Sequence, residues 1–460
     1  MSTVTINGNV SFWWTQLGLP TRRQKLPGSR TADVCIVGGG YTGLWTAYYL
    51  KKRMPSLDVV ILESEFAGFG ASGRNGGWLT NSITGGRRQY LSTSTHGEVE
   101  RMQKLMNEAV DEVIRVAGEH NIQADIHKGG ELSIATTPAQ LRRLSALATA
   151  ERLWRESGLV ELSADETQER IRIPSALGGT WHPHCARIHP AKLVRGLAQT
   201  VESLGVTIYE STTVSEIRPH QARTDAGTVT AEIVIRATEG FTANLRHEHR
   251  TWLPMNSSLI VTEPLTDSQW NSIGWEGRET LGNFAHVYMY AQRTFDNRIA
   301  FGGRGNPYRF GSRTDKDGAT QVKTIASLRE ALVTFFPAAE EVPIAHAWSG
   351  VLGVPRDWAA TMGLNRATGL GWAGGYVGTG VTTTNMAGRT LADLVLQRET
   401  EHTRLPWVGH MSRKWECEPL RWLAVQGIYR AYNQADKREQ GGRAETSILA
   451  KIADVVAGRH

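Results

Sequence analysis

The segment Ala32-Asp-Val-Cys-Ile-Val-Gly-Gly-Gly-Tyr-Thr-Gly43 decides the fold. Its apolar residues 34–37 predict a short buried strand, and the glycines that follow form a G-x-G-x-x-G turn that opens a helix. In such a turn Gly38 permits the tight bend, Gly40 lets the backbone approach a pyrophosphate, and Gly43 lets the helix pack against the strand. The N-terminus of the helix then presents unpaired N–H groups to the phosphates.

A second strand is predicted at residues 59–62, and it ends at Glu63, twenty residues after Gly43. At that distance an acidic side chain accepts hydrogen bonds from the ribose hydroxyls of an adenine dinucleotide. The carboxylate would repel a 2′-phosphate, so NADP is disfavoured. Residues 68–73 and 369–374 match the glycine pattern without the surrounding strand, helix and acid, and we interpret both as loops.

The position of this unit near the N-terminus, with no second complete unit, favours FAD over NAD. The loop Gly68-Phe-Gly-Ala-Ser-Gly-Arg-Asn-Gly-Gly77 supports this choice, because it is too rich in glycine for a helix or a strand. Such a loop offers backbone N–H groups, and here one cation, to a ligand. We predict that six of its residues bind the cofactor: Ser72, Gly73, Arg74, Asn75, Gly76 and Gly77.

These features resemble the glycine/D-amino-acid oxidase family of FAD-dependent enzymes, most of all its γ-glutamylputrescine-oxidase-like branch. Later segments add to the resemblance in the same order: Val234-Ile-Arg-Ala-Thr-Glu-Gly240, Thr262-Glu-Pro-Leu265, Gly374-Gly-Tyr-Val-Gly-Thr-Gly380 and Ala387-Gly388. The resemblance implies that a residue near Val214 packs against adenine. It implies further cofactor-binding residues: Val214, Ala237, Thr238, Gly240, Gly353, Gly378, Thr379, Gly380 and Val381.

The resemblance also implies an α/β fold, in which a Rossmann-type FAD-binding domain is interleaved with a substrate domain built on an antiparallel sheet with helices. A chain of 460 residues is too long for one simple core. We expect an N-terminal arm over residues 1–30 and a C-terminal tail over 401–460. The FAD-binding domain is assigned to residues 31–80, 186–250 and 346–400, and the substrate domain to 81–185 and 251–345.

The sheet of the substrate domain is predicted to contain strands at residues 257–262, 286–290 and 298–303. Tyr288 and Tyr290 would share one face of the second strand at period two. In the family this sheet covers the flavin, so we predict both tyrosines in the catalytic site as groups that orient the substrate. Outward packing against helices is the alternative. Arg293 and Arg304 are candidates for a substrate carboxylate, although surface ion pairing is the commoner role of such arginines and the favoured interpretation of each.

The resemblance implies oxidation of a C–N bond of a small-molecule amine or amino acid. The neutral amine aims its α C–H bond at flavin N5, a hydride is transferred, and the imine product hydrolyses. The helix expected after Gly380 would direct its first amides at the flavin N1–C2=O edge and stabilise negative charge there. A backbone angle that only glycine adopts easily is expected at Gly380. No catalytic acid–base pair is evident.

Departures from the family pattern shape two expectations. The strand at 298–303 lacks the lysine that promotes reaction with oxygen in sarcosine-oxidase relatives, so the electron acceptor is O2 or another acceptor. Thr379 stands where many members have histidine. Cysteine and histidine, through which several relatives attach their flavin, are absent from residues 68–77 and 348–388. We therefore expect non-covalent FAD.

The composition excludes several partners. The net charge of +6 is spread along the chain without a long Lys/Arg block, which argues against nucleic acid. No apolar run reaches the ~18 residues of a membrane span. The three scattered cysteines fit a reducing cytoplasm. His182-Pro-His-Cys185 lacks a second ligand pair, so no metal site is predicted.

Two other functional classes remain open. A flavin-dependent hydroxylase or monooxygenase shares the N-terminal fingerprint, but it would usually show Gly-Asp before the C-terminal helix, where this chain has Gly378-Thr-Gly380. A non-catalytic flavoprotein scaffold is suggested by the aromatic residues of the tail. The substrate and the oligomeric state cannot be predicted from the sequence.

Overall fold

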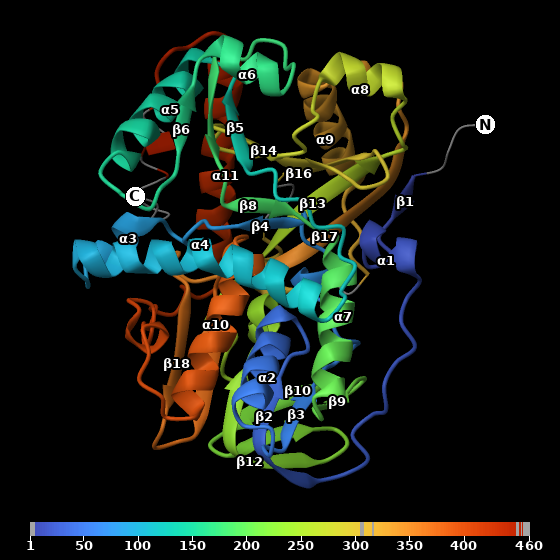
Figure 1. Cartoon of the computed structure of the whole chain (residues 1–460), viewed down its shortest axis with the longest axis vertical. Coiled ribbons are helices and arrows are strands. Elements are labelled where there is room, and N and C mark those ends of the chain that lie inside the picture. The colour runs from blue at the N-terminus through green and yellow to red at the C-terminus, as the bar shows by residue number, and fades with distance from the viewer. Residues whose placement is uncertain (1–4, 304–307, 315–316, 448–449, 452, 454–460) are drawn as a thin grey trace.

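The computed structural model describes residues 5–303, 308–314, 317–447, 450–451 and 453. Two large sheets organise these residues, one of eight strands and one of nine. In Figure 1 the eight-stranded sheet lies in the lower half of the molecule and the nine-stranded sheet in the upper half. Helices pack on both sheets, so the predicted α/β fold with an antiparallel second sheet is confirmed.

The eight-stranded sheet contains the nucleotide-binding unit predicted from the sequence. Its order is β10-β11-β12-β2-β3-β9, with β19 on β12 and β18 on β19. The pairs β12–β2, β2–β3, β3–β9 and β12–β19 are parallel. The strands are β2 (Arg30–Val37), β3 (Val59–Leu62), β9 (Thr207–Tyr209), β10 (Val214–Arg218), β11 (Gln221–Thr224), β12 (Thr228–Arg236), β18 (Thr361–Asn365) and β19 (Leu370–Gly374).

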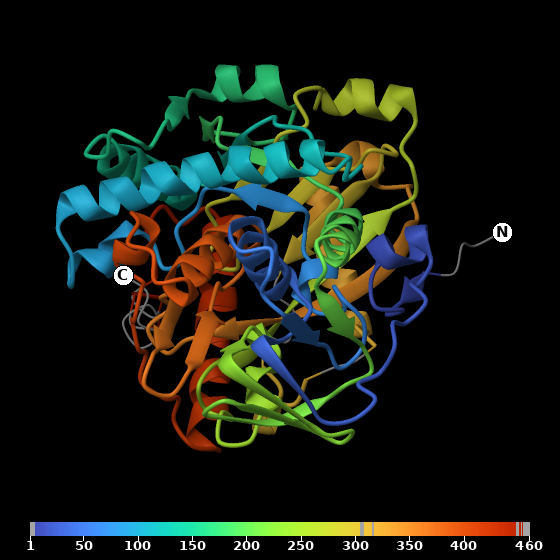
Figure 2. The same ribbon diagram turned by 60° about the horizontal axis from the view of Figure 1, so that its bottom comes forward.

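Glycine allows the helices to lie close to this sheet and to each other. The helix α2 (Tyr41–Arg53) connects β2 to β3, and a Cβ on Gly43 would lie only 2.1 Å from the carbonyl oxygen of Gly38. A Cβ on Gly388 of α10 (Gly380–Val395) would lie 2.6 Å from Cβ of Trp45. As a result α2 and α10 lie side by side although the sequence separates them widely, as Figures 1 and 2 both show. The helix α7 (Pro190–Ser203) packs beside α2.

The nine-stranded sheet has the order β1-β17-β13-β16-β15-β14-β5-β7-β6. Its neighbours are antiparallel except for the pairs β1–β17 and β5–β14. The strands are β1 (Ile6–Asn7), β5 (Glu131–Ala135), β6 (Val160–Leu162), β7 (Gly178–His182), β13 (Leu253–Thr262), β14 (Thr280–Asn283), β15 (Tyr290–Arg293), β16 (Ile299–Gly303) and β17 (Ile344–Val354). The strand β17 belongs to this sheet, although most of it falls in the range assigned to the FAD-binding domain. The domain boundaries themselves stay a prediction.

The predicted strand at 286–290 is wrong, because β15 begins only at Tyr290. The preceding backbone is held by a helix instead of a neighbouring strand. The N–H groups of His286 and Val287 donate to the carboxylate of Asp436, at 2.9 and 2.7 Å. Asp436 belongs to α11 (Leu420–Gln440), so the C-terminal tail is docked on the nine-stranded half of the molecule.

Aromatic side chains anchor both ends of the described chain. In α1 (Phe12–Leu17) the first three side chains, Phe12, Trp13 and Trp14, are buried. Trp407 and Trp415 are buried in the C-terminal segment. The remaining helices are α3 (Arg87–Leu91), α4 (His96–Glu119), α5 (Pro138–Glu151), α6 (Ala164–Arg170), α8 (Asp267–Ile273) and α9 (Val322–Phe335). Within the described residues, none of the helices is long and apolar enough to span a membrane.

Candidate functional site

A cavity with about 1310 Å³ of empty space, part of it open to solvent, lies beside the carboxyl ends of the parallel strands. This is the edge at which open α/β sheets bind their ligands. The structure brings together twelve of the predicted cofactor-binding residues around this space: Gly38, Gly40, Glu63, Ser72, Asn75, Val214, Ala237, Thr238, Gly240, Gly378, Gly380 and Val381.

The N-termini of two long helices open onto the cavity. Gly40 precedes α2 and Thr379 precedes α10, and neither residue makes a side-chain capping hydrogen bond. Among the amides at the start of α2, that of Tyr41 donates to the Ser72 hydroxyl at 2.8 Å. Because helix N-termini carry a partial positive charge and unpaired N–H groups, the two ends give the cavity an affinity for negatively charged groups.

The other seven predicted cofactor-binding residues do not line the cavity, and neither do Tyr288 and Tyr290. Gly43 allows the contact between α2 and β2 described above. A Cβ on Gly76 would lie 2.6 Å from the ring of Tyr290, and one on Gly77 would lie 1.9 Å from Nε2 of Gln292. The remaining four are Gly73, which lies against Trp14; Arg74; Gly353, whose amide donates to Glu239; and Thr379, which shares a hydrogen bond with Thr84.

Arg74 does not line the cavity. Its buried side chain donates from Nε to the carbonyl oxygen of Phe69 at 2.8 Å, and its Cζ lies 4.3 Å from the centre of the Phe69 ring. Its Nη1 also donates to the carbonyl oxygen of Ser349 in β17. The guanidinium thus joins the glycine-rich loop to the nine-stranded sheet.

Glu63 lies where the dinucleotide pattern predicts, at the end of β3 and on the wall of the cavity. Its carboxylate accepts hydrogen bonds from the amide of Gly39 at 2.8 Å and from that of Glu65 at 3.0 Å. Burial raises the pKa of the Glu63 carboxyl, while these two amides oppose the rise. The carboxylate is thereby held at the turn that opens α2.

We predict that Glu63→Ala weakens FAD binding by about 1–3 kcal/mol, because ribose hydroxyls would lose their acceptor in a buried site. The measurement is the dissociation constant of FAD, by titration of the apoprotein. Glu65→Ala is the matched control: its carboxylate pairs with Arg22 at 2.7 Å, and we expect a smaller effect. Equal FAD affinity in Glu63→Ala and the unmodified protein would contradict the assignment.

Glu239 is a cavity residue that the sequence analysis missed. Its carboxylate accepts hydrogen bonds from the amides of Gly375 at 2.8 Å, Gly353 at 3.2 Å and Tyr376 at 3.3 Å. Its own backbone has a φ of +42°, which is uncommon for a residue with a side chain. Burial raises the pKa of Glu239 to about 7, against the effect of the three amides. An acid in the variable position of Ala237-Thr-Glu-Gly240 was the only signal, and its partners are far away in the sequence.

The predicted wall tyrosines lie next to the glycine-rich loop. The Tyr290 hydroxyl is 2.9 Å from that of Ser257, and the rings of Tyr288 and Tyr290 are 6.4 Å apart and nearly parallel. Arg293 is buried in a contact with Trp270 and Trp275 and pairs with Glu276, so it is a structural residue. Arg304 lies outside the described residues.

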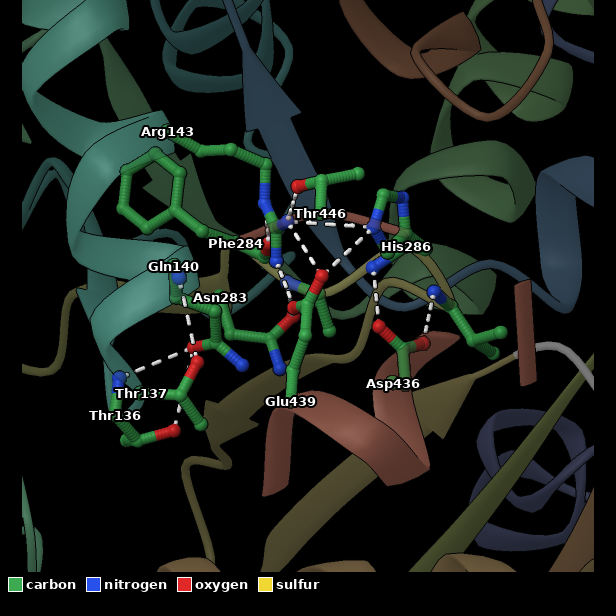
Figure 3. Close-up of polar contacts among 12 residues, drawn as sticks. Thr136, Thr137, Gln140, Arg143, Asn283, Phe284, His286, Asp436, Glu439 and Thr446 are labelled. Atoms are coloured by element: carbon green, nitrogen blue, oxygen red, sulfur yellow. Dashed lines mark hydrogen bonds and ion pairs between the residues drawn. The ribbon is translucent and has the colours of Figure 1, made fainter. Parts of the chain in front are cut away.

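One group of side chains has the spacing of a metal site. The ligand atoms of His286, Asp436 and Glu439 lie within 4.8 Å of one another. Figure 3 shows why a docking contact explains them better. Both oxygens of Glu439 pair with the guanidinium of Arg143, at 2.6 and 3.0 Å, and Arg143 also donates to the carbonyl oxygen of Phe284. The cluster fastens α11 to α5 and to the loop before Tyr290.

Comparison with known proteins identifies the class. The model of the family described as FAD dependent oxidoreductase (DAO) matches residues 33–394. Gamma-glutamylputrescine oxidoreductase of Escherichia coli (strain K12) is 31% identical over 374 residues, which cover 80% of this chain and 84% of that protein. Glycine oxidase of Geobacillus kaustophilus (strain HTA426) is 24% identical over 388 residues, 82% of this chain and 96% of that protein. The crystal structure of a Geobacillus kaustophilus glycine oxidase has the same fold, with a TM-score of 0.66 over 80% of this chain and 96% of that chain.

The chain therefore belongs to the FAD-dependent oxidoreductase family. The cavity fits the cofactor of that family. Gly38 and Gly40 line it without side chains, two helix N-termini open onto it, and Glu63 offers a carboxylate on its wall.

Proposed function

We propose that this protein oxidises the C–N bond of a small amine or amino acid with FAD, giving an imine that hydrolyses. Glu63 would hold the ribose of FAD, the N-terminus of α2 its pyrophosphate, and the N-terminus of α10 the N1 edge of the flavin. The bound flavin supplies the acceptor for the hydride. The observation that carries the proposal is the position of Tyr290, whose ring lies against Gly76 at the glycine-rich loop beside the cavity.

In this proposal the protein contributes positioning and charge. Tyr288 and Tyr290 orient the substrate and exclude water from its reacting carbon. The substrate nitrogen must be neutral, so that its lone pair can form the C=N bond as the hydride leaves. The first amides of α10 favour negative charge at the flavin edge. Family relatives named for γ-glutamylputrescine and for glycine support a substrate of this class.

Mixing the purified protein with candidate amines without oxygen tests this function. Loss of the oxidised flavin absorbance with an amine or amino acid, but not with the matching alcohol or carboxylic acid, is the expected result. Rapid bleaching by NADPH alone would instead support the hydroxylase alternative. A purified protein without a flavin spectrum would support the scaffold alternative. Repeating the reaction with O2 and with an artificial acceptor separates an oxidase from a dehydrogenase.

We propose that the FAD is attached non-covalently, because neither the 68–77 loop nor residues 348–388 contain cysteine or histidine. We predict that heat denaturation followed by precipitation releases FAD into the supernatant. Yellow colour in the pellet, together with a flavin mass on a peptide, would contradict this. We propose a cytoplasmic location from the sparse cysteines.

A further inference from the structure

A buried carboxylate that the proposed reaction does not use lies on the inner face of the nine-stranded sheet. Glu131 Oε2 accepts a hydrogen bond from the Thr80 hydroxyl at 2.7 Å and lies 3.5 Å from His182 Nε2. The Glu131 and His182 side chains are only 15% and 13% exposed. Burial opposes ionisation, but the contacts with His182 and Thr80 keep the pKa of Glu131 below its ordinary value. The group is therefore an anion at neutral pH.

Part of this anion is open to a further ligand. Both contacts reach Oε2, and among the described residues no hydrogen bond reaches Oε1 of Glu131. A carboxylate has about four acceptor positions on its two oxygens. Nδ1 of His182 is buried and also has no hydrogen-bond partner among the described residues. Buried polar atoms are normally paired, so the Glu131–His182 pair has capacity to bind a ligand.

The register of the sheet places Glu131 on the same face as Tyr290. Ser133 follows Glu131 at period two and pairs with Gly282, which in turn pairs with Tyr290. A Cβ on Gly282 would lie 2.5 Å from the Tyr288 hydroxyl and 3.1 Å from Oγ of Ser133. The Tyr288 hydroxyl thus lies over the row of residues adjacent to Glu131.

The rings of Trp78, Tyr288 and Tyr290 form one aromatic group. The centre of the Trp78 ring lies 6.3 Å from that of Tyr288 and 6.2 Å from that of Tyr290, edge-on to both. None of the three side chains is completely buried. Trp78 precedes Thr80 in β4 (Trp78–Thr80), the strand that also supplies the hydrogen bond to Glu131. Aromatic faces attract cations, most strongly where water is excluded.

We propose that Glu131 and the rings of Trp78, Tyr288 and Tyr290 bind an alkylammonium group of the substrate. This inference rests on the proposed amine oxidation and names its substrate class. A nearby carboxylate favours the protonated form of an amine, whereas the nitrogen that is oxidised must be neutral. The group bound by Glu131 is therefore a second nitrogen of the substrate. The substrate is a diamine or polyamine, and its aliphatic spacer places the reacting carbon near the glycine-rich loop.

Binding of a cation that cannot react tests the subsite without turnover. Choline has no lone pair on nitrogen, and 3,3-dimethylbutan-1-ol is its uncharged analogue of the same shape. By calorimetry we expect the FAD-loaded protein to bind choline about 10–30-fold more tightly than the alcohol. Glu131→Gln should remove this preference, and Glu131→Asp should keep part of it.

Glu279→Gln is the matched control. Glu279 is a buried carboxylate next to Thr280, the residue that pairs with Glu131, but it pairs with Arg170. Arg170 lies over the ring of Trp181, which pairs with Leu132 on the face opposite to Glu131. We therefore expect Glu279→Gln to bind choline as the unmodified protein does. A thermal melt of each variant reports whether it is folded. The proposal is overturned if the unmodified protein shows no preference for choline over the alcohol. It is also overturned if folded Glu131→Gln keeps that preference.

Reduction of the flavin separates this inference from the proposed function. The probes are 1,5-diaminopentane and hexylamine, which differ by a terminal ammonium against a methyl group. Glu131→Gln should raise the apparent dissociation constant of the diamine about 10–30-fold. The apparent dissociation constant of hexylamine and the limiting rate of flavin reduction should both stay within about twofold of their values in the unmodified protein. Failure of every amine to reduce the flavin would contradict the proposed function, while the choline measurement still decides the role of Glu131. Equal weakening of both amines would show a merely structural role.

Discussion

Gly38→Ala is expected to abolish FAD binding and to lower the stability of the protein by about 2–5 kcal/mol. Gly38 has a φ of +115°, in the region that favours glycine. A Cβ there would also lie 2.4 Å from the carbonyl oxygen of Ala237 and 2.9 Å from its carbon. Both atoms belong to the backbone next to β12, so they can move only if the parallel pairing of β2 and β12 is disturbed. FAD content after purification and urea unfolding measure the two effects.

Gly86→Ala separates the backbone effect from the clash. Gly86 has a φ of +78°, but a Cβ there would meet no atom within 4 Å, and it does not line the cavity. We expect this variant to lose about 1–2 kcal/mol of stability and to retain its FAD. If Gly38→Ala behaves like Gly86→Ala in both measurements, the first turn of the nucleotide unit does not approach the cofactor as we propose.

The features that could be predicted from sequence are those whose partners are close along the chain. The strand, turn, helix and second strand around Gly38 and Glu63 lie within about thirty residues, and periodicity with turn chemistry is enough to predict them.

The features that were missed or wrong depend on contacts between distant segments. Glu239 takes its hydrogen bonds from residues 114 and 136 positions later. His286 donates to a carboxylate 150 positions later, and this contact replaces the strand pairing that its local sequence suggested. Glu131 shares a face of the sheet with Tyr290 through the register of three strands, β5, β14 and β15. In each case the local pattern is weak, and tertiary contacts decide the structure.

The predicted glycine-only angle at Gly380 is wrong. Gly380 begins α10 without a positive φ, whereas Gly378 has a φ of +107°. A Cβ on Gly380 would lie 3.3–3.6 Å from the side chain of Tyr376, a crowded but tolerable contact. The reason to expect an effect at Gly380 is therefore its place on the cavity wall, at the first turn of the helix.

We expect Gly380→Val to weaken FAD binding and to slow amine oxidation while the protein stays folded. The branched side chain would occupy space at the helix N-terminus, so the N1 edge of the flavin would lie farther from the amides. Negative charge on the reduced flavin would then lose about 1–2 kcal/mol of stabilisation. For a two-electron couple this corresponds to a midpoint potential about 20–40 mV lower. Gly97→Val is the comparison, because Gly97 also lies in the first turn of a helix, α4, its Cβ would meet no atom within 4 Å, and it does not line the cavity. If Gly380→Val retains normal FAD content, midpoint potential and turnover, the start of α10 does not contact the flavin, and this end of the cavity must be assigned to another ligand.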